Sequence, residues 1–573
     1  MRRSSTTLST LLKRRVIELF AGQPAGSVDF TVTADLGTPM ADGTVLLGDL
    51  YRPLDAGPQP VVLIRTPYGR SQLLGRVFAT VLARRGFTVF QQSVRGTFGS
   101  GGVFRPFTDE HRDGLDTLAW VRRQEWCDGR VATTGASYFG HTQWAVAPYA
   151  DPPLVALSLH ITSASIRDLF YEHGAPGSLN AIGWSDSIAR QEEPQPAPLL
   201  AGFGRRRRVV RALSTRPLRE ADVTSTGQPV PFWRDFTEHA APGDAFWDVA
   251  DHDGADLTRM PPVNMVTGWW DLFLQAQLHD YAALRAAGVP ARLTIGPWLH
   301  GRRPELQEIL RSDLEWLEHH LQGGPAPEGA AVRVQLQGTD DWLGFETWPP
   351  PQATTDRRYL TADAALAAEP PERAVPPSTF TFHPDDPTVF DGGPLLFAPA
   401  AQTDDWRAEQ GIDVLVLTGQ VEPADLDVVG PVRATLHVRP ERDHADVVVR
   451  LCDVDEQGVS RNVVDGIRRL DPKTVPADDV TVGDDGVLTV DVELFPTAYR
   501  FAKGHRLRLV VAGGAFPRFA PNPGTGRSLA ESTDGPPCRF EVFHDAQHPS
   551  HLRLPVLPAD AARVPAPGSP VRS

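Results

Sequence analysis

Cysteine is scarce in this sequence, and its scarcity excludes disulfide-stabilised folds and cysteine-ligated metal folds. Only three of the 573 residues are cysteines, and they lie far apart at Cys127, Cys452 and Cys538. An odd number of separated cysteines makes neither a disulfide framework nor a metal motif. None is placed as a nucleophile, so we expect a cytoplasmic protein that uses no metal or other cofactor.

Long apolar runs and an excess of positive charge are also missing. No stretch approaches the roughly 18 consecutive apolar residues of a membrane-spanning helix, which predicts no membrane partner. The formal net charge of −15 disfavours nucleic acid as a partner, and we interpret the basic run Arg205–Arg208 as a solvated helix face. With 41% hydrophobic and 22% charged residues, the chain is typical of a soluble globular protein of two or three domains.

The pattern of apolar residues divides the chain into four parts. Strands alternate with helices over residues 26–163 and again over 256–348, which predicts one α/β domain with a mostly parallel sheet. Residues 164–255 interrupt this alternation with a polar helical stretch, expected to cap the carboxyl edge of the sheet. Residues 349–573 carry the short alternating strands of a jelly-roll β-sandwich, and residues 1–25 predict an N-terminal helical extension.

The elements around the expected site can be bounded from their apolar periodicity and turn residues. Trp126–Gly129 is predicted to be a turn. The predicted strands are Pro60–Arg65, Val131–Thr134, Leu154–His160, Pro262–Thr267 and Ala291–Ile295, and the predicted helices are Asp109–Arg123, Gly140–Ala150, Leu272–Ala287 and Asp313–Leu321.

The stretch Gly135–Gly140 has the spacing of a catalytic turn. A predicted strand precedes it and a predicted helix follows it, which is the plan of the nucleophile elbow in an α/β-hydrolase. Such a turn would hold Ser137 in a strained conformation with its hydroxyl above the sheet. The sequence reads G-x-S-x-x-G, with Phe139 at the usual second glycine, so these six residues alone are a weak signal.

Two residues at predicted strand ends complete a candidate triad with Ser137. Asp271 and His300 each follow a buried strand, so both are expected at the same sheet edge as the serine. The chain order is that of α/β-hydrolases, with His300 as general base and Asp271 orienting it. For Asp271 a helix N-cap is the alternative role. Less well placed alternatives are His141, His279, His319 and His320 for the base, and Asp256 and Asp280 for the acid.

An oxyanion hole needs two hydrogen-bond donors that face the reacting carbonyl. The backbone N–H of Tyr138, directly after the serine, would be the first. The hydroxyl of Tyr68, in a loop after an early strand, is a candidate for the second, although a packing role fits the residues equally well. The candidates for lining the substrate pocket are Trp184 and Trp270.

Five segments in combination resemble the cocaine-esterase and X-Pro dipeptidyl-peptidase family of serine hydrolases. They are Arg65–Tyr68, Val94–Gly96, Trp126–Gly129 leading into Gly135–Gly140, Gly268–Asp271 and Gly296–His300. The elbow with tyrosine directly after the serine is similar to this family's own variant. In the β half, Asp465–Ile467, Phe516–Phe519 and Asn522-Pro523 add to the resemblance, which covers about residues 28–555.

This resemblance implies an α/β-hydrolase domain, a helical cap and a C-terminal jelly roll. It implies a serine hydrolase that cleaves small-molecule esters or amides through an acyl-enzyme. On the matching positions it implies Ser137, Asp271 and His300 as the triad, and it favours the Tyr68 hydroxyl and the Tyr138 amide as oxyanion donors.

Several alternatives stay open within and outside this class. We expect an esterase, because a dipeptidyl peptidase or α-amino-acid ester hydrolase needs a cap carboxylate for the substrate amine, and Glu172, Glu192 and Glu193 are interpreted as surface residues. An ordinary lipase is disfavoured because no long apolar lid segment is found. A carbohydrate-binding protein with an inactive hydrolase core is a non-enzymatic alternative. The oligomeric state is open, a homodimer included.

Overall fold

The computed structural model describes residues 15–193, 198–241, 243–397, 400–475, 477–559, 561 and 563–568. Within them the chain divides into two units. One comprises residues 15–167, 245–333 and 567–568, and the other comprises 168–244 and 334–566. Of the predicted N-terminal extension, residues 15–20 are helical and residues 1–14 lie outside the described residues.

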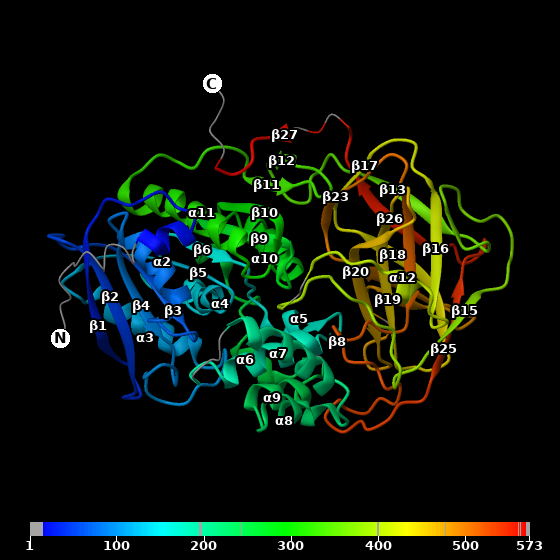
Figure 1. Ribbon diagram of the computed structural model, residues 1–573, viewed down its shortest axis with the longest axis horizontal. Helices are drawn as coiled ribbons and strands as arrows, with labels where there is room; N and C mark the ends of the chain where they lie inside the picture. The colour runs from blue at the N-terminus through cyan, green and yellow to red at the C-terminus, as the bar shows by residue number, and fades with distance from the viewer. Residues whose placement is uncertain are drawn as a thin grey trace. The chain divides into compact units, whose positions relative to one another are not determined.

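A mostly parallel sheet forms the centre of the first unit (Figure 1). In spatial order its strands are β1 (Phe30–Pro39), β2 (Val45–Pro53), β4 (Thr88–Ser93), β3 (Gln59–Thr66), β5 (Cys127–Ala136), β6 (Leu157–His160), β9 (Val263–Trp270) and β10 (Ala291–Leu299). The pairs β1–β2 and β2–β4 are antiparallel, and the pairs from β4 to β10 are parallel. The carboxyl ends of β5, β6, β9 and β10 therefore lie side by side.

Helices cover this sheet and explain why its central strands are continuously apolar. They are α2 (Leu73–Ala83), α3 (Glu110–Arg122), α4 (Tyr138–Trp144), α10 (Leu274–Ala286) and α11 (Arg303–Gln322). Phe78 of α2 and Leu317 of α11 share one core with Val62, Ile64 and Val266 of the sheet. A strand covered on both faces has no solvated side, so every side chain from Val61 onward in β3 is buried.

The second unit contains the helical segment and an all-β domain. The short helices are α5 (Ile166–Phe170, which begins in the first unit), α6 (Ser178–Ala189), α7 (Pro198–Ala212), α8 (Ala221–Thr226) and α9 (Pro231–Glu238), with a hairpin of β7 (Tyr171–Glu172) and β8 (Ala175–Pro176). The all-β domain is built from β13 (Thr354–Leu360), β14 (Ala365–Ala367), β15 (Ser378–Phe382), β16 (Val414–Val421), β17 (Leu426–Gly430), β18 (Arg433–Pro440), β19 (Ala445–Val454), β20 (Ser460–Leu470), β21 (Val480–Val482), β22 (Leu488–Glu493), β23 (Thr497–Phe501), β24 (Arg506–Ala512), β25 (Cys538–Phe543) and β26 (His551–Val556).

The remaining elements are short: β11 (Val332–Gln335), β12 (Trp342–Phe345), β27 (Arg563–Val564) and α12 (Trp406–Glu409).

The expected fold, an α/β-hydrolase domain with a C-terminal all-β domain, is confirmed, but several predicted bounds were wrong. Strand β5 begins at Cys127, which pairs with Gln59 of β3, so most of the predicted turn Trp126–Gly129 is strand. Helix α4 begins directly after the serine and ends at Trp144. Helix α11 begins at Arg303, where a proline in its first turn starts the helix well before Asp313.

The basic run Arg205–Arg208 is more than a solvated face. It lies on α7, where Arg205 and Arg208 approach the buried carboxylate of Asp186 on α6 at 2.9 and 3.4 Å. The prediction of a solvated helix face is therefore only partly correct, because two of the four guanidinium groups hold α7 to α6.

A chain of buried ion pairs joins the β7–β8 hairpin to the all-β domain within the second unit. Arg518, only 6% exposed, binds Glu172 at 2.6 Å and also pairs with Asp465. Asp465 receives a second guanidinium from Arg450 at 2.7 Å, and Arg450 binds Asp405 at 2.8 Å. Glu172 is thus not the surface residue that we expected, because its buried carboxylate is neutralised by an arginine more than three hundred positions away.

Replacing Arg518 with methionine is expected to lower the free energy of unfolding by about 3–5 kcal/mol, because the Glu172 carboxylate loses its counter-charge and Asp465 keeps only Arg450. Urea unfolding followed by tryptophan fluorescence measures this loss. The control is Arg539→Met, which breaks the exposed pair between Arg539 and Glu541 and should cost less than about 1 kcal/mol. Equal losses in both variants would show that the buried network contributes no more to stability than an exposed ion pair.

Candidate active site

The turn between β5 and α4 holds Ser137 in a conformation that few non-glycine residues adopt. Its φ is 60° and its ψ is −125°. Such a backbone costs about 1–3 kcal/mol and persists only where the surroundings enforce it. The N–H of Ser137 donates to the carbonyl of His160 at 2.9 Å, and its own carbonyl accepts from Gly140 N at 2.8 Å. These bonds tie the strained residue to β6 on one side and to α4 on the other.

The two glycines of the turn are required by close approach. A Cβ on Gly135, whose φ is 152°, would lie 2.3 Å from Cβ of Phe139 in α4. A Cβ on Gly140 would lie 2.5 Å from Thr162, just beyond β6. The glycine three residues after the serine therefore makes room between α4 and β6. This requirement explains the G-x-S-x-x-G sequence pattern.

A buried polar network anchors the turn from the opposite side of α4. The hydroxyl of Tyr138 donates to Glu110 Oε1 at 2.8 Å and accepts the N–H of Phe107 at 2.8 Å. Burial raises the pKa of Tyr138 well above 10, so its hydroxyl keeps its proton. Arg65, at the end of β3, binds Glu110 at 3.0 Å. Sequence reasoning missed Glu110, although an arginine within an apolar strand is a sign that a buried acid lies nearby.

The structure brings His300 and Asp271 together. His300 Nδ1 lies 2.7 Å from Asp271 Oδ2, and the aspartate side chain is fully buried. Asp271 Oδ1 accepts the N–H of Phe273 at 2.8 Å, so the carboxylate also stabilises the turn before α10. The predicted contact with His300 is therefore found, whereas the predicted N-cap role is wrong, because α10 begins at Leu274 and its N-cap is Phe273.

A tryptophan explains the glycines that precede these two residues. A Cβ on Gly268 would lie 2.3 Å from the carbonyl oxygen of Trp298, and a Cβ on Gly296 would lie 2.4 Å from its indole ring. The last residues of β10, where the pairing with β9 shifts register between Gly296 and Leu299, therefore lie closely against the end of β9. This close approach carries His300 to Asp271.

The sheet contains a second histidine–aspartate pair that sequence reasoning did not consider. His160 Nε2 lies 2.8 Å from Asp313 of α11, and His160 Nδ1 accepts the N–H of Val266 at 3.1 Å. Both ring nitrogens are engaged and the side chain is fully buried. A histidine with no ring nitrogen left for a substrate proton serves structure, whereas the His300 side chain keeps 9% of its surface exposed.

Tyr68 lies beside the elbow, as the predicted oxyanion donor must. It follows the end of β3, and its ring centroid is 5.7 Å from that of Phe139 and 6.4 Å from that of Tyr138. Its N–H donates to Thr66 Oγ1 at 3.0 Å, which shapes the loop, and the side chain is half-buried.

The two tryptophans proposed for the substrate pocket lie in different units. Trp270 is the last residue of β9 and directly precedes Asp271, with 5% of its surface exposed. Trp184 lies on α6 of the second unit, 7% exposed, with its ring 4.8 Å from that of Phe232. Their part in substrate binding stays a prediction.

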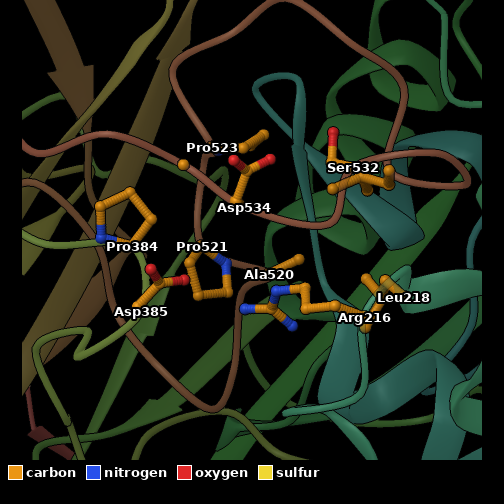
Figure 2. A pocket seen from close by; sticks show the side chains of 11 residues that line it. Arg216, Leu218, Pro384, Asp385, Ala520, Pro521, Pro523, Ser532 and Asp534 are labelled. Carbon is orange, nitrogen blue, oxygen red and sulfur yellow. The ribbon is translucent and has the colours of Figure 1, made fainter.

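An open recess of about 350 Å³ in the second unit is lined by Arg216, Asp385, Ser532 and Asp534 among others (Figure 2), and it contains none of the predicted catalytic residues. Over the described parts of the chain, no group of three or more histidine, cysteine or acidic residues is placed to hold a metal ion. Nor does any described helix have the length and apolar character needed to cross a membrane.

Comparison with known proteins gives matches over almost the whole chain. Residues 42–302 match the model of the X-Pro dipeptidyl-peptidase (S15) family, and residues 328–553 match that of the X-Pro dipeptidyl-peptidase C-terminal non-catalytic domain. The chain is 28% identical to cocaine esterase from Rhodococcus sp. (strain MB1 Bresler), over 92% of this chain and 99% of that protein.

Solved structures share the fold over a similar extent. An aminopeptidase from a marine sediment Thaumarchaeota archaeon and an α-amino acid ester hydrolase each superpose with a TM-score of 0.76 at 22% identity. Each match covers 93% of this chain, with 97% and 98% of the respective relative.

Proposed function

We propose that this chain, a member of the X-Pro dipeptidyl-peptidase (S15) family with similarity to cocaine esterase, hydrolyses small carboxylic esters. The reaction proceeds through an acyl-enzyme on Ser137. The observation that carries this mechanism is the 2.7 Å hydrogen bond between His300 and Asp271, which follow β10 and β9 at the same carboxyl edge of the sheet as the strained serine. A strained elbow alone exposes a hydroxyl, and the aligned imidazole supplies the base that activates it.

The reaction follows from these roles. Ser137 Oγ attacks the ester carbonyl while its proton passes to His300 Nε2, and Asp271 stabilises the imidazolium. The Tyr138 N–H and the Tyr68 hydroxyl donate to the oxyanion of the tetrahedral intermediate. His300 then gives the proton to the departing alkoxide, which leaves Ser137 acylated. A water molecule, deprotonated by His300, attacks the acyl group, and His300 returns the proton to Ser137 Oγ as the carboxylic acid is released.

The preference for esters over peptides rests on two observations. Cocaine esterase, of which this chain covers 99%, is an esterase by name. Moreover, Glu172, the most buried of the three cap carboxylates considered for binding a substrate amine, is already paired with Arg518. We further propose that the helical segment lines the pocket through Trp184, that Trp270 lines it from β9, and that the enzyme is cytoplasmic. A homodimer is the assembly that we would test first.

A substrate panel tests this proposal. We expect p-nitrophenyl and aryl esters to be turned over with the highest kcat/KM, α-amino-acid esters less well, and X-Pro p-nitroanilides least. A higher kcat/KM for X-Pro p-nitroanilides than for any ester would replace the esterase proposal with a dipeptidyl peptidase.

Replacing Tyr68 with phenylalanine should lower kcat by on the order of 10²-fold, because the transition state loses one of its two oxyanion donors. Steady-state kinetics with a p-nitrophenyl ester measures the change. Tyr149→Phe is a suitable control, since Tyr149 is exposed on the same unit and should leave kcat unchanged. Equal kcat values for Tyr68→Phe and wild type would remove Tyr68 from the mechanism.

A further inference from the structure

A second buried carboxyl group lies behind the His300–Asp271 pair. Glu305 is in the first turn of α11 and is 0% exposed. Its Oε2 accepts the backbone N–H of Gly301 at 2.7 Å, and Gly301 is the residue directly after His300. Among the described residues its other oxygen, Oε1, is buried without a hydrogen-bond partner. A carboxyl group that is fully desolvated and accepts a single hydrogen bond is unusual and needs a reason.

The charges around Glu305 determine its protonation. Desolvation and the nearby charge of Asp271 both raise the pKa of Glu305 well above 4.5. Two carboxyl groups that share one buried region do not both ionise, so one proton is retained. Asp271 is stabilised as the anion by two donors, His300 Nδ1 and the N–H of Phe273, whereas Glu305 has one. Burial and the neighbouring Asp271 therefore favour the neutral form of Glu305.

The hydrogen bond to Gly301 connects Glu305 to the catalytic histidine. Gly301 has a φ of 64°, so the chain turns sharply immediately after His300. Glu305 binds the peptide N–H at this turn and holds it to the start of α11. Because Gly301 is bonded directly to His300, a shift of this peptide would also shift the imidazole. A small displacement of a reacting group costs up to about 10²-fold in rate.

We propose that Glu305 is a positioning residue for the hydrolase reaction, holding the Gly301 peptide and with it His300 while adding no second negative charge beside Asp271. The inference rests on the proposed function, because it assumes that His300 is the base. The protonation state of Glu305 also affects the His300 imidazolium that forms during the reaction. An ionised Glu305 would stabilise that cation further and move the acid limb of the pH–rate profile to higher pH.

The test compares Glu305→Gln with Glu305→Ala in the full chain. The glutamine side-chain oxygen is neutral and still accepts the Gly301 N–H, so kcat should stay within about threefold of wild type and the acid limb should not move. Alanine removes the acceptor, so kcat should fall roughly 10- to 100-fold with little change in KM. Rates are expressed per active serine, titrated with a fluorophosphonate, so that loss of folded protein is not counted as loss of rate.

Glu308→Gln is the matched control, since Glu308 lies one turn later on α11 and pairs with Arg311. It should leave kcat and the pH profile unchanged. An acid limb that moves to lower pH in Glu305→Gln would mean that Glu305 is ionised in the wild type, and unchanged kcat in Glu305→Ala would mean that it positions nothing. Either result overturns the proposal. A loss of kcat in Glu305→Gln as large as that in Glu305→Ala would also overturn it. Absent ester turnover by the wild type would instead overturn the proposed function itself.

Discussion

Replacing Ser137 with alanine is expected to lower kcat for a p-nitrophenyl ester by roughly 10⁴- to 10⁶-fold while KM changes little. Without the hydroxyl no acyl-enzyme forms, and the remaining rate comes from the oxyanion donors acting on a water molecule. The substituted side chain is small and lies at a half-buried turn, so the fold should tolerate the change. Steady-state kinetics together with the unfolding midpoint measures both effects.

A matched control for this variant is Ser214→Ala, because Ser214 is an exposed serine of the second unit. Its kcat should equal that of the wild type. A Ser137→Ala enzyme that keeps more than about one-hundredth of wild-type turnover would show that another residue is the nucleophile.

Replacing Asp271 with asparagine should lower kcat by about 10⁴-fold. The asparagine amide donates to His300 Nδ1, which forces the ring proton onto Nε2, and this nitrogen then no longer accepts the proton of Ser137. The imidazolium also loses the anion that stabilises it. Kinetics with an activated ester measures the loss, and fluorophosphonate labelling should slow in parallel.

The second histidine–aspartate pair provides the control. Asp313→Asn changes a carboxylate that binds His160 and Thr134 Oγ1, so it should cost stability, by about 1–3 kcal/mol, rather than turnover. Its kcat per labelled serine should stay within about threefold of wild type. Comparable losses of kcat in Asp271→Asn and Asp313→Asn would contradict the assignment of His300 as the base.

The sequence was sufficient to predict the sheet and the strand ends of the candidate site. Val61–Ile64 is a buried apolar run, and Val263, Met265 and Val266 are buried apolar residues of β9. In a parallel sheet the residues that follow such strands meet at one edge. For that reason Asp271 and His300 could be predicted as partners although they are distant along the chain from the serine.

The remaining features depend on pairings that no local pattern records. Glu172 meets Arg518 only because β7 packs on the all-β domain, and Glu110 meets Tyr138 only because α3 passes behind the elbow. Sequence reasoning therefore interpreted Glu172 as a surface residue and overlooked Glu110. Glu305 was not identified for a different reason. The helix α11 was predicted to begin ten residues later, at Asp313 instead of Arg303, so Glu305 lay outside the predicted helix.

We propose that Ser137 is the activated nucleophile of this hydrolase. Labelling of the wild-type protein with a fluorophosphonate, followed by peptide mass spectrometry, tests it most directly. We predict one adduct per chain, on the peptide that contains Ser137, with no labelling of Ser137→Ala and greatly slowed labelling of Asp271→Asn. An unlabelled wild type, or an adduct on any other residue, would contradict the claim.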